Sequence, residues 1–156
     1  MDSLGSQEKM GSTLPSKSDA SSEQQDLSKL LDEVRNFAGD LIGSPGRFPP
    51  FGATVSCDGE VGLVVFQPAP GISGQEFINR LAASVRAQAV KEKLCAACVA
   101  YMVSMEIQSQ PVDAIVANVQ HRSGKPLEVI VPFKRVGKAA QFGQQAVQPG
   151  TMSLFP

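Results

Sequence analysis

The sequence contains no tryptophan, one tyrosine (Tyr101) and one histidine (His121) among its 156 residues. Proteins that bind single-stranded nucleic acid stack the bases on several aromatic side chains set among basic ones, and this chain lacks that pattern. Its formal net charge of −1 also differs from the basic balance that is typical of nucleic-acid-binding domains. We therefore expect no nucleic-acid partner.

Long apolar runs and a secretory signal are missing as well. No stretch approaches the roughly 18 consecutive apolar residues of a membrane-spanning helix. The N-terminus has no basic region followed by an apolar core, which is the pattern of a signal peptide. We expect no membrane association, and a cytoplasmic location is the default prediction.

Cysteine is scarce and odd in number, with Cys57, Cys95 and Cys98. Three cysteines do not make the disulfide framework of a small secreted protein, and the apolar neighbours of Cys95 and Cys98 favour buried thiols in a reducing compartment. The CxxC spacing of this pair also occurs in metal and thiol-redox sites. A second CxxC or paired histidines are absent, however, and a Cys3His site with His121 exhausts the available ligands. We expect neither a metal nor another cofactor.

Catalytic signatures are also absent, because no GxSxG, HExxH, phosphate-loop or dinucleotide-binding motif occurs. His121 needs an orienting carboxylate to act as a general base. In the predicted hairpin Asp113 lies near the far end of its strand and Glu128 lies on the opposite face, so neither supports it. We expect His121 to be hydrogen-bonded at a turn, and the chain to be non-catalytic.

The clearest positive signal is a hairpin from Asp113 to Lys134. Apolar residues alternate with other residues along both arms, as in strands that are buried on one face. A three-residue loop from Arg122 to Gly124 places the apolar faces together, with Gly124 in the left-handed conformation of a G1 bulge. The predicted pairs are Val119 with Leu127, Ala117 with Val129, and Ile115 with Val131.

The other elements follow from similar signals. Apolar residues at helical spacing predict a helix from Ser22, capped with Gln25 and ending at Gly43. Asp58-Gly59 predicts a second hairpin with a two-residue turn. A capping box at Ser73 starts a second helix, residues 94–108 read as a long strand, and the apolar segment near the C-terminus is expected to dock as a short strand or plug.

These elements predict an α+β fold, with an antiparallel sheet of about five strands (two hairpins plus a long strand) and two helices packed on one face. Residues 1–21 form a Ser-rich leader that we expect to be disordered, and residues 22–156 a single domain. Apolar residues such as Val116 and Ile130 on the uncovered sheet face indicate a homodimer or a protein partner.

The preferred function is a small cytoplasmic interaction module that acts through a sheet face, as a homodimer or with a protein partner. The first alternative is a small-ligand binder or enzyme with a pocket near the 121–125 hairpin tip. The second is a metal or thiol-redox protein that uses Cys95 and Cys98. The candidate ligand or partner contacts are basic or titratable side chains of the hairpin and its exit: His121, Arg122, Lys125, Lys134 and Arg135.

Overall fold

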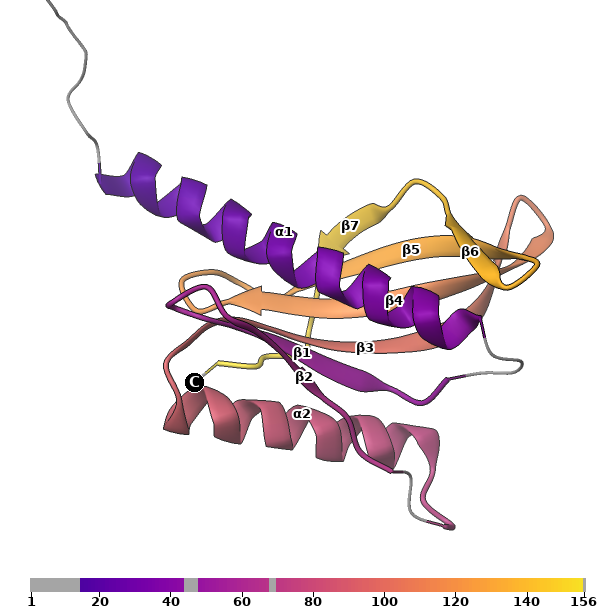
Figure 1. Ribbon diagram of the computed structural model, residues 1–156, viewed down its shortest axis with the longest axis horizontal. Helices are drawn as coiled ribbons and strands as arrows, with labels where there is room; N and C mark the ends of the chain where they lie inside the picture. The colour runs from indigo at the N-terminus through magenta and orange to yellow at the C-terminus, as the bar shows by residue number, and fades with distance from the viewer. Residues whose placement is uncertain (1–14, 44–47, 68–69, 156) are drawn as a thin grey trace, which may run out of the picture.

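The computed structural model describes residues 15–43, 48–67 and 70–155 (Figure 1). Two helices and seven strands follow one another along these ranges. In chain order they are α1 (Pro15–Ile42), β1 (Phe51–Ser56), β2 (Val61–Val64), α2 (Gly74–Lys91), β3 (Leu94–Ile107), β4 (Gln110–His121), β5 (Leu127–Val136), β6 (Ala139–Phe142) and β7 (Ala146–Pro149).

The strands form one antiparallel sheet in the order β2-β1-β3-β4-β5-β6. The outer edge of β5 is shared, because β6 pairs with one end of it and β7 with the other. The predicted α+β fold with an antiparallel sheet is therefore confirmed, with more strands than the five expected. The additional strands are β6 and β7, each four residues long, which carry too few apolar residues for a clear alternation.

Helix α1 covers one face of the sheet. Its fully buried residues recur every four positions and so form one stripe: Leu30, Val34, Ala38 and Ile42. The helix begins at Pro15, so Ser22 lies inside it rather than at its N-cap, and the predicted capping box does not form. Residues 1–14 of the expected leader lie outside the described residues.

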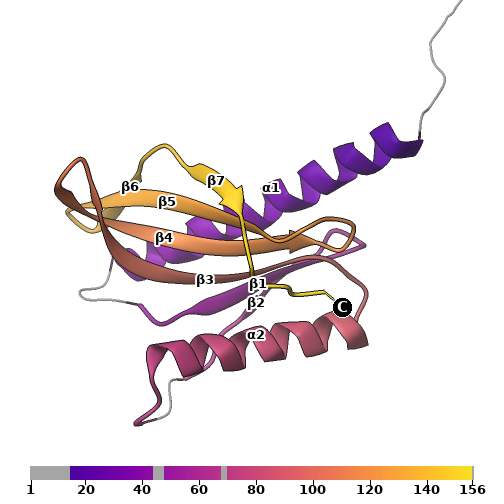
Figure 2. The same cartoon turned by 180° about the vertical axis from the view of Figure 1, so that it is seen from behind.

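Helix α2 covers the opposite face, so the expectation that both helices pack on one face is wrong (Figures 1 and 2). Alternate residues of β3 explain the difference. Cys98 packs with the α1 side, whereas Ala97 and Val99 pack with α2. Because both faces of this strand are apolar, the sheet needs cover on both sides. The predicted N-cap is confirmed, since Ser73 Oγ accepts a hydrogen bond from the Glu76 amide at 3.1 Å.

The central hairpin has the predicted register, with Val119 opposite Leu127, Ala117 opposite Val129 and Ile115 opposite Val131. Gly124, however, does not have a positive φ, so the predicted G1 bulge is wrong. Its amide instead donates to the carbonyl of His121 at 2.9 Å. A Cβ at this position would come within 2.8 Å of Glu23 Oε2 on α1, so a larger residue here would displace the end of the Glu23 side chain.

The turn between β1 and β2 is also one residue longer than predicted. Ser56 pairs with Glu60, and of the three loop residues only Gly59 has a positive φ, of 92°. Within this loop the Cys57 amide donates to the Lys93 carbonyl, next to β3, at 2.9 Å. Cys57 is thereby directed toward the start of β3.

The C-terminal segment docks as a plug, as predicted. Leu154 is fully buried between α2 and β3, and Gln120 Oε1 accepts hydrogen bonds from the amides of Leu154 and Phe155. Phe48 and Phe51 are buried on the α1 side. In the described part of the chain, neither helix has the length and apolar character needed to cross a bilayer.

Candidate functional site

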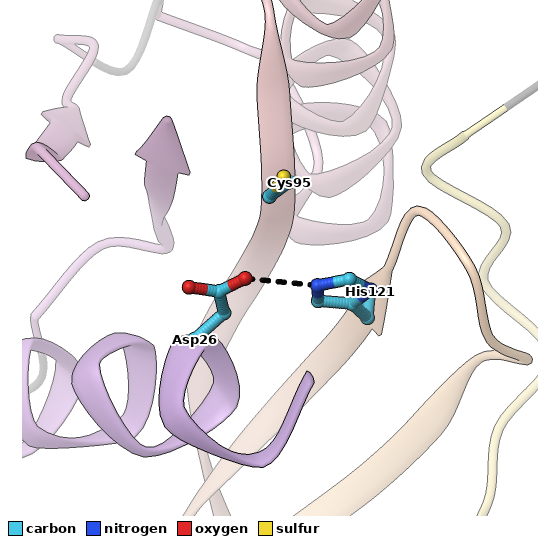
Figure 3. Close-up of side chains that lie close together, drawn as sticks. All are labelled: Asp26, Cys95 and His121. Carbon is cyan, nitrogen blue, oxygen red and sulfur yellow. Dashed lines mark hydrogen bonds and ion pairs between the residues drawn. The ribbon is translucent and has the colours of Figure 1, made fainter. Parts of the chain in front are cut away.

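His121 lies at the end of β4 with only 8% of its side chain exposed, and both of its ring nitrogens have partners. Nε2 is 2.9 Å from Asp26 Oδ2 (Figure 3). Nδ1 is 2.8 Å from Ser123 Oγ. The Ser123 amide also donates to Nδ1 at 3.2 Å, which fits the tautomer that carries its proton on Nε2. The expected turn contact is present, but the histidine is buried rather than on the rim.

The carboxylate that the sequence analysis sought for His121 comes from α1. Asp26 is four residues before the buried Leu30 and therefore extends the apolar stripe of the helix toward β4. The hairpin itself contains only Asp113 and Glu128 as acidic residues, so its pattern alone does not predict Asp26 as the partner. A carboxylate in register with an apolar helical stripe is the signal that points to it, because such a group needs a buried polar partner.

A second carboxylate joins the same network. Glu23, one turn before Asp26, accepts a hydrogen bond from Ser123 Oγ at 3.2 Å and lies 3.9 Å from His121 Nδ1. The Ser123 hydroxyl has a single proton and can therefore donate a hydrogen bond either to Glu23 or to His121. The protonation of the ring and the direction of this hydrogen bond are therefore coupled.

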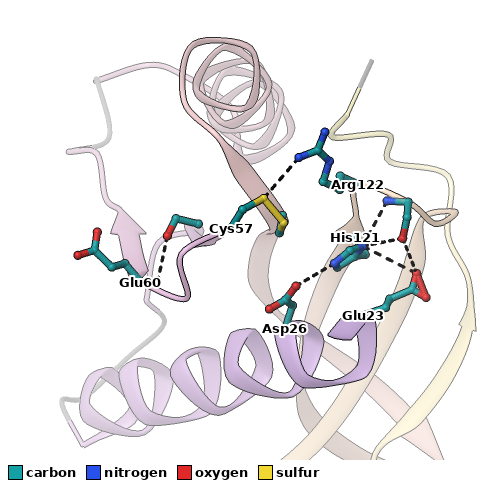
Figure 4. The surroundings of a disulfide bond; sticks show 9 residues. Glu23, Asp26, Cys57, Glu60, His121 and Arg122 are labelled. Carbon is teal, nitrogen blue, oxygen red and sulfur yellow. Dashed lines mark hydrogen bonds and ion pairs between the residues drawn. A yellow bond between two sulfur atoms is a disulfide. The ribbon is translucent and has the colours of Figure 1, made fainter. Parts of the chain in front are cut away.

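Cys57 and Cys95 form a disulfide beside this network, with their Cα atoms 4.9 Å apart (Figure 4). This corrects the prediction that Cys95 is a buried free thiol. The register of β1 against β3 shifts at this point, because Val55 pairs with Ala96 and Ser56 with Leu94. Cys95 is the extra residue of this irregularity, which breaks the strict alternation of β3 and allows its side chain to lie near Asp26 and His121.

Cys98 has the buried, apolar setting that was predicted for it. It is a free thiol in the core on the α1 side, and burial raises its pKa well above the ordinary value. It takes no part in the disulfide, so the CxxC pair that was considered for metal or redox chemistry does not act as a pair.

The five candidate contact residues fall into two groups at opposite ends of β5. His121, Arg122 and Lys125 lie at the hairpin loop, where Arg122 Nη1 donates to Cys57 Sγ at 3.4 Å. Lys134 and Arg135 lie at the far end, where Arg135 pairs with Asp113 at 3.4 Å. Lys134 lines a separate hollow of about 330 Å³ between β5 and β6. The five residues therefore do not form one site.

A cavity of about 220 Å³ adjoins His121, and Lys125 contributes to its wall. Its volume is below the roughly 300–1,000 Å³ of typical small-molecule sites. Its lining comes from α1 and the hairpin: Glu23, Leu27, His121, Gly124, Lys125 and Leu127. A space of this size suits an ion or a few waters better than an organic substrate.

Asp26, His121 and Ser123 have the side-chain types of a hydrolase triad, but their surroundings differ from one. Acyl transfer needs unpaired backbone amides to stabilise the oxyanion. The amides of Arg122, Ser123 and Gly124 already donate to Cys95 O, His121 Nδ1 and His121 O. None of these three amides is therefore free to stabilise an oxyanion beside Ser123.

Comparison of the chain with protein-family models, with curated proteins and with solved structures finds no match. The functional assignment therefore depends on the chemistry and geometry of this chain.

Proposed function

We propose that the protein is a non-catalytic interaction module that forms a homodimer through the part of its sheet that α2 leaves uncovered. Helix α2 packs on β1 and β3. In Figure 2 no helix lies over β4 and β5 on the side toward the viewer, where the segment after β7 crosses the sheet to reach Gln120 and α2. We call this surface the open face. It consists of Tyr101, Val103, Val116, Ile130 and Pro132.

The observation that carries the proposal is a row of three apolar side chains across the open face. Tyr101 pairs with Val116, which pairs with Ile130, so the three lie side by side on β3, β4 and β5. Val116 is buried, whereas Tyr101 and Ile130 on either side of it are partly exposed. A contiguous apolar surface on a sheet is typical of a protein-binding site.

The charges at the two ends of β5 favour a second copy of the chain as the partner. Glu128 and Lys134 flank Ile130 and Pro132 at even positions, so all four share the open face. A two-fold axis through the apolar row brings Glu128 of one copy toward Lys134 of the other, and the reverse pair forms at the same time. The surface is thus complementary to itself in charge as well as in polarity.

Sedimentation velocity of the full chain over a range of micromolar concentrations tests the proposal. We expect a dimer for the natural sequence and a monomer for Ile130→Glu, because a carboxylate in the apolar row loses its water without a partner. The matched control is Val90→Glu, since Val90 lies on the outer side of α2 and is 72% exposed. This control is expected to remain a dimer.

Two results would contradict the homodimer. One is a monomer at every concentration, whether or not another protein purifies with it. The other is a dimer that survives Ile130→Glu but is lost in Leu63→Glu. Leu63 belongs to β2, an edge strand whose apolar side chains are partly exposed, so that result would place the interface at the sheet edge.

The cytoplasmic location belongs to the same proposal. Cytoplasmic proteins keep their cysteines reduced, whereas Cys57 and Cys95 are bonded here. This location therefore requires that the bond be reduced in the cell for at least part of the protein's lifetime. Alkylation of free thiols in a freshly lysed cell, followed by mass analysis of Cys57 and Cys95, measures that fraction. A pair that is oxidised in every molecule would contradict a cytoplasmic location.

A further inference from the structure

The disulfide, His121 and Asp26 meet at the end of the sheet under the first half of α1. One ligand atom each from Asp26, Cys95 and His121 lies within 4.8 Å of the other two, and Cys57 Sγ is bonded to Cys95 Sγ. We propose that reduction of this disulfide creates a binding site for one Zn²⁺ ion, with Cys57, Cys95, His121 and Asp26 as its four ligands.

The ligand types suit this ion. Zinc in structural sites is bound by four ligands in a tetrahedron, drawn from Cys sulfur, His nitrogen and carboxylate oxygen. The four side chains come from α1, the β1–β2 turn, β3 and β4, so a bound ion connects the helix to the sheet. Nε2 of His121 is already directed at Asp26, at 2.9 Å, and both atoms can face an ion placed between them and the sulfurs.

The sulfur atoms must separate for this to happen. Two sulfurs that bind one tetrahedral zinc lie about 3.8 Å apart, given a Zn–S bond of ~2.3 Å, so they cannot remain bonded to each other. Cys57 lies in the β1–β2 turn, and its side chain, half-buried like that of Cys95, can rotate away from its partner once the bond is broken. Cys95 is held by the hydrogen bond from the Arg122 amide to its carbonyl at 2.8 Å.

The chemistry balances as two steps. A thiol reductant of the glutathione class supplies two electrons and two protons, so that the S–S bond breaks, two cysteine thiols form, and two equivalents of the reductant become one disulfide. Zinc then binds both sulfurs as thiolates, and two protons leave to solvent. The His121 ring binds through Nε2 after its proton has moved to Nδ1.

Ser123 Oγ can act as an acceptor for that second tautomer, which gives up the hydrogen bond that the Ser123 amide donates to Nδ1 at 3.2 Å. A histidine that binds a metal usually donates its other N–H to a nearby acceptor, which fixes the ring. Here Nδ1 lies 2.8 Å from Ser123 Oγ, which can accept a hydrogen bond from it. The Ser123 hydroxyl meanwhile donates its own hydrogen bond to Glu23 Oε2 at 3.2 Å. The chain of His121, Ser123 and Glu23 therefore supplies the acceptor that the metal-bound form needs.

The charges are also near balance. Two thiolates and one carboxylate exceed the charge of Zn²⁺ by one unit, and Arg122 lies beside the sulfurs, with Nη1 3.4 Å from Cys57 Sγ. Its guanidinium offsets the remaining negative charge and favours the thiolate form of Cys57. Cys98 is not a candidate ligand, since it is buried in the core with the residues that pack under α1.

The test uses the full chain, freed of metal, in its oxidised form and after reduction with a phosphine. Native mass spectrometry after addition of Zn²⁺ is expected to show one ion per chain in the reduced form and none in the oxidised form. Co²⁺ in place of Zn²⁺ is expected to give the absorption bands of a tetrahedral site with thiolate ligands. Competition with a chromophoric chelator then measures affinity.

The variants separate this site from adventitious binding. His121→Ala and Asp26→Asn are each expected to lower the zinc affinity at least tenfold, whereas Cys98→Ala, the matched cysteine control, is expected to leave it unchanged. Asp26→Asn keeps the size of the side chain and a hydrogen-bonding oxygen, and circular dichroism checks that it folds. The proposal is wrong if the reduced protein binds no zinc, if the oxidised protein binds it equally, or if both ligand variants keep the natural affinity.

Discussion

Asp26 illustrates how one residue holds the end of β4 in place. Its side chain is 19% exposed and its carboxylate meets the Nε2 of a histidine that is almost fully buried. Removing one partner of a buried hydrogen bond leaves the other without water or protein to bond to. The pair therefore contributes more to the fold than a surface contact of the same length.

We expect Asp26→Ala to lower the free energy of unfolding by about 1–3 kcal/mol, because His121 Nε2 loses its partner in a place that water barely reaches. Urea denaturation measures the change. Asp32→Ala is the control, since Asp32 pairs with Arg35 on the exposed side of the same helix and should cost below about 1 kcal/mol. Equal losses in the two variants would contradict this account of His121.

Cys98 makes the stability depend on pH at the alkaline end. Burial raises the pKa of its thiol above the ordinary value near 9.0, so the unfolded chain loses this proton at a lower pH than the folded one. The contribution is intact below pH 9 and falls above it, by up to about 1.4 kcal/mol per pH unit. We expect the difference in unfolding free energy between the natural chain and Cys98→Ala to shrink as pH rises from 8 to 10. A difference that is constant over this interval would argue against a buried thiol.

The elements differ in how far the sequence predicted them. Period-two alternation located the central hairpin and its register, since a shift by one residue would have turned Ile115, Ala117 and Val119 away from the core. The turns were harder. The β3–β4 turn uses Gln108 and Ser109, both with positive φ, where glycine or asparagine is the usual signal.

The contribution of the C-terminal plug to the free energy of unfolding can be measured. Leu154 has no exposed surface and packs with Leu81, Val85 and Val99 under α2. We expect Leu154→Ala to lower the free energy of unfolding by about 2–4 kcal/mol, from lost burial and the cavity left behind. Val147→Ala on β7, where the side chain is largely exposed, should change it by below about 0.5 kcal/mol. Thermal or urea unfolding of both variants decides the matter, and a small loss for Leu154→Ala would mean that the tail is not a structural part of the core.

On the scale of the whole molecule, the proposed dimer predicts that reversing the charge at residue 128 or 134 weakens association and that reversing both restores it. Glu128→Lys and Lys134→Glu are each expected to weaken association about three- to tenfold, because each places like charges opposite one another across the two-fold axis. The double variant restores both opposite-charge pairs and should recover most of the affinity. Sedimentation at low salt measures all three. Additive losses in the double variant would show that the two residues do not meet across an interface.

The candidate site depends on distances that only the complete fold supplies. Asp26 and His121 are 95 residues apart in the chain, and Cys57 and Cys95 are 38 apart. The sequence predicted the strand, the helix and the turn that carry them, but not that α1 crosses the sheet at the end of β4. His121 was identified as a candidate by its rarity, whereas its partners followed from the direction of a helix that no local pattern encodes.

The disulfide also changes how the molecule is connected. Cys57 and Cys95 enclose β2 and α2, so these two elements form a covalent ring that closes on β3. A single protease cut between β2 and α2 opens the ring but leaves one molecule, with both pieces joined through sulfur. Electrophoresis of such nicked protein should therefore show one band without reductant and two with it, which makes the oxidation state at the end of the sheet visible on a gel.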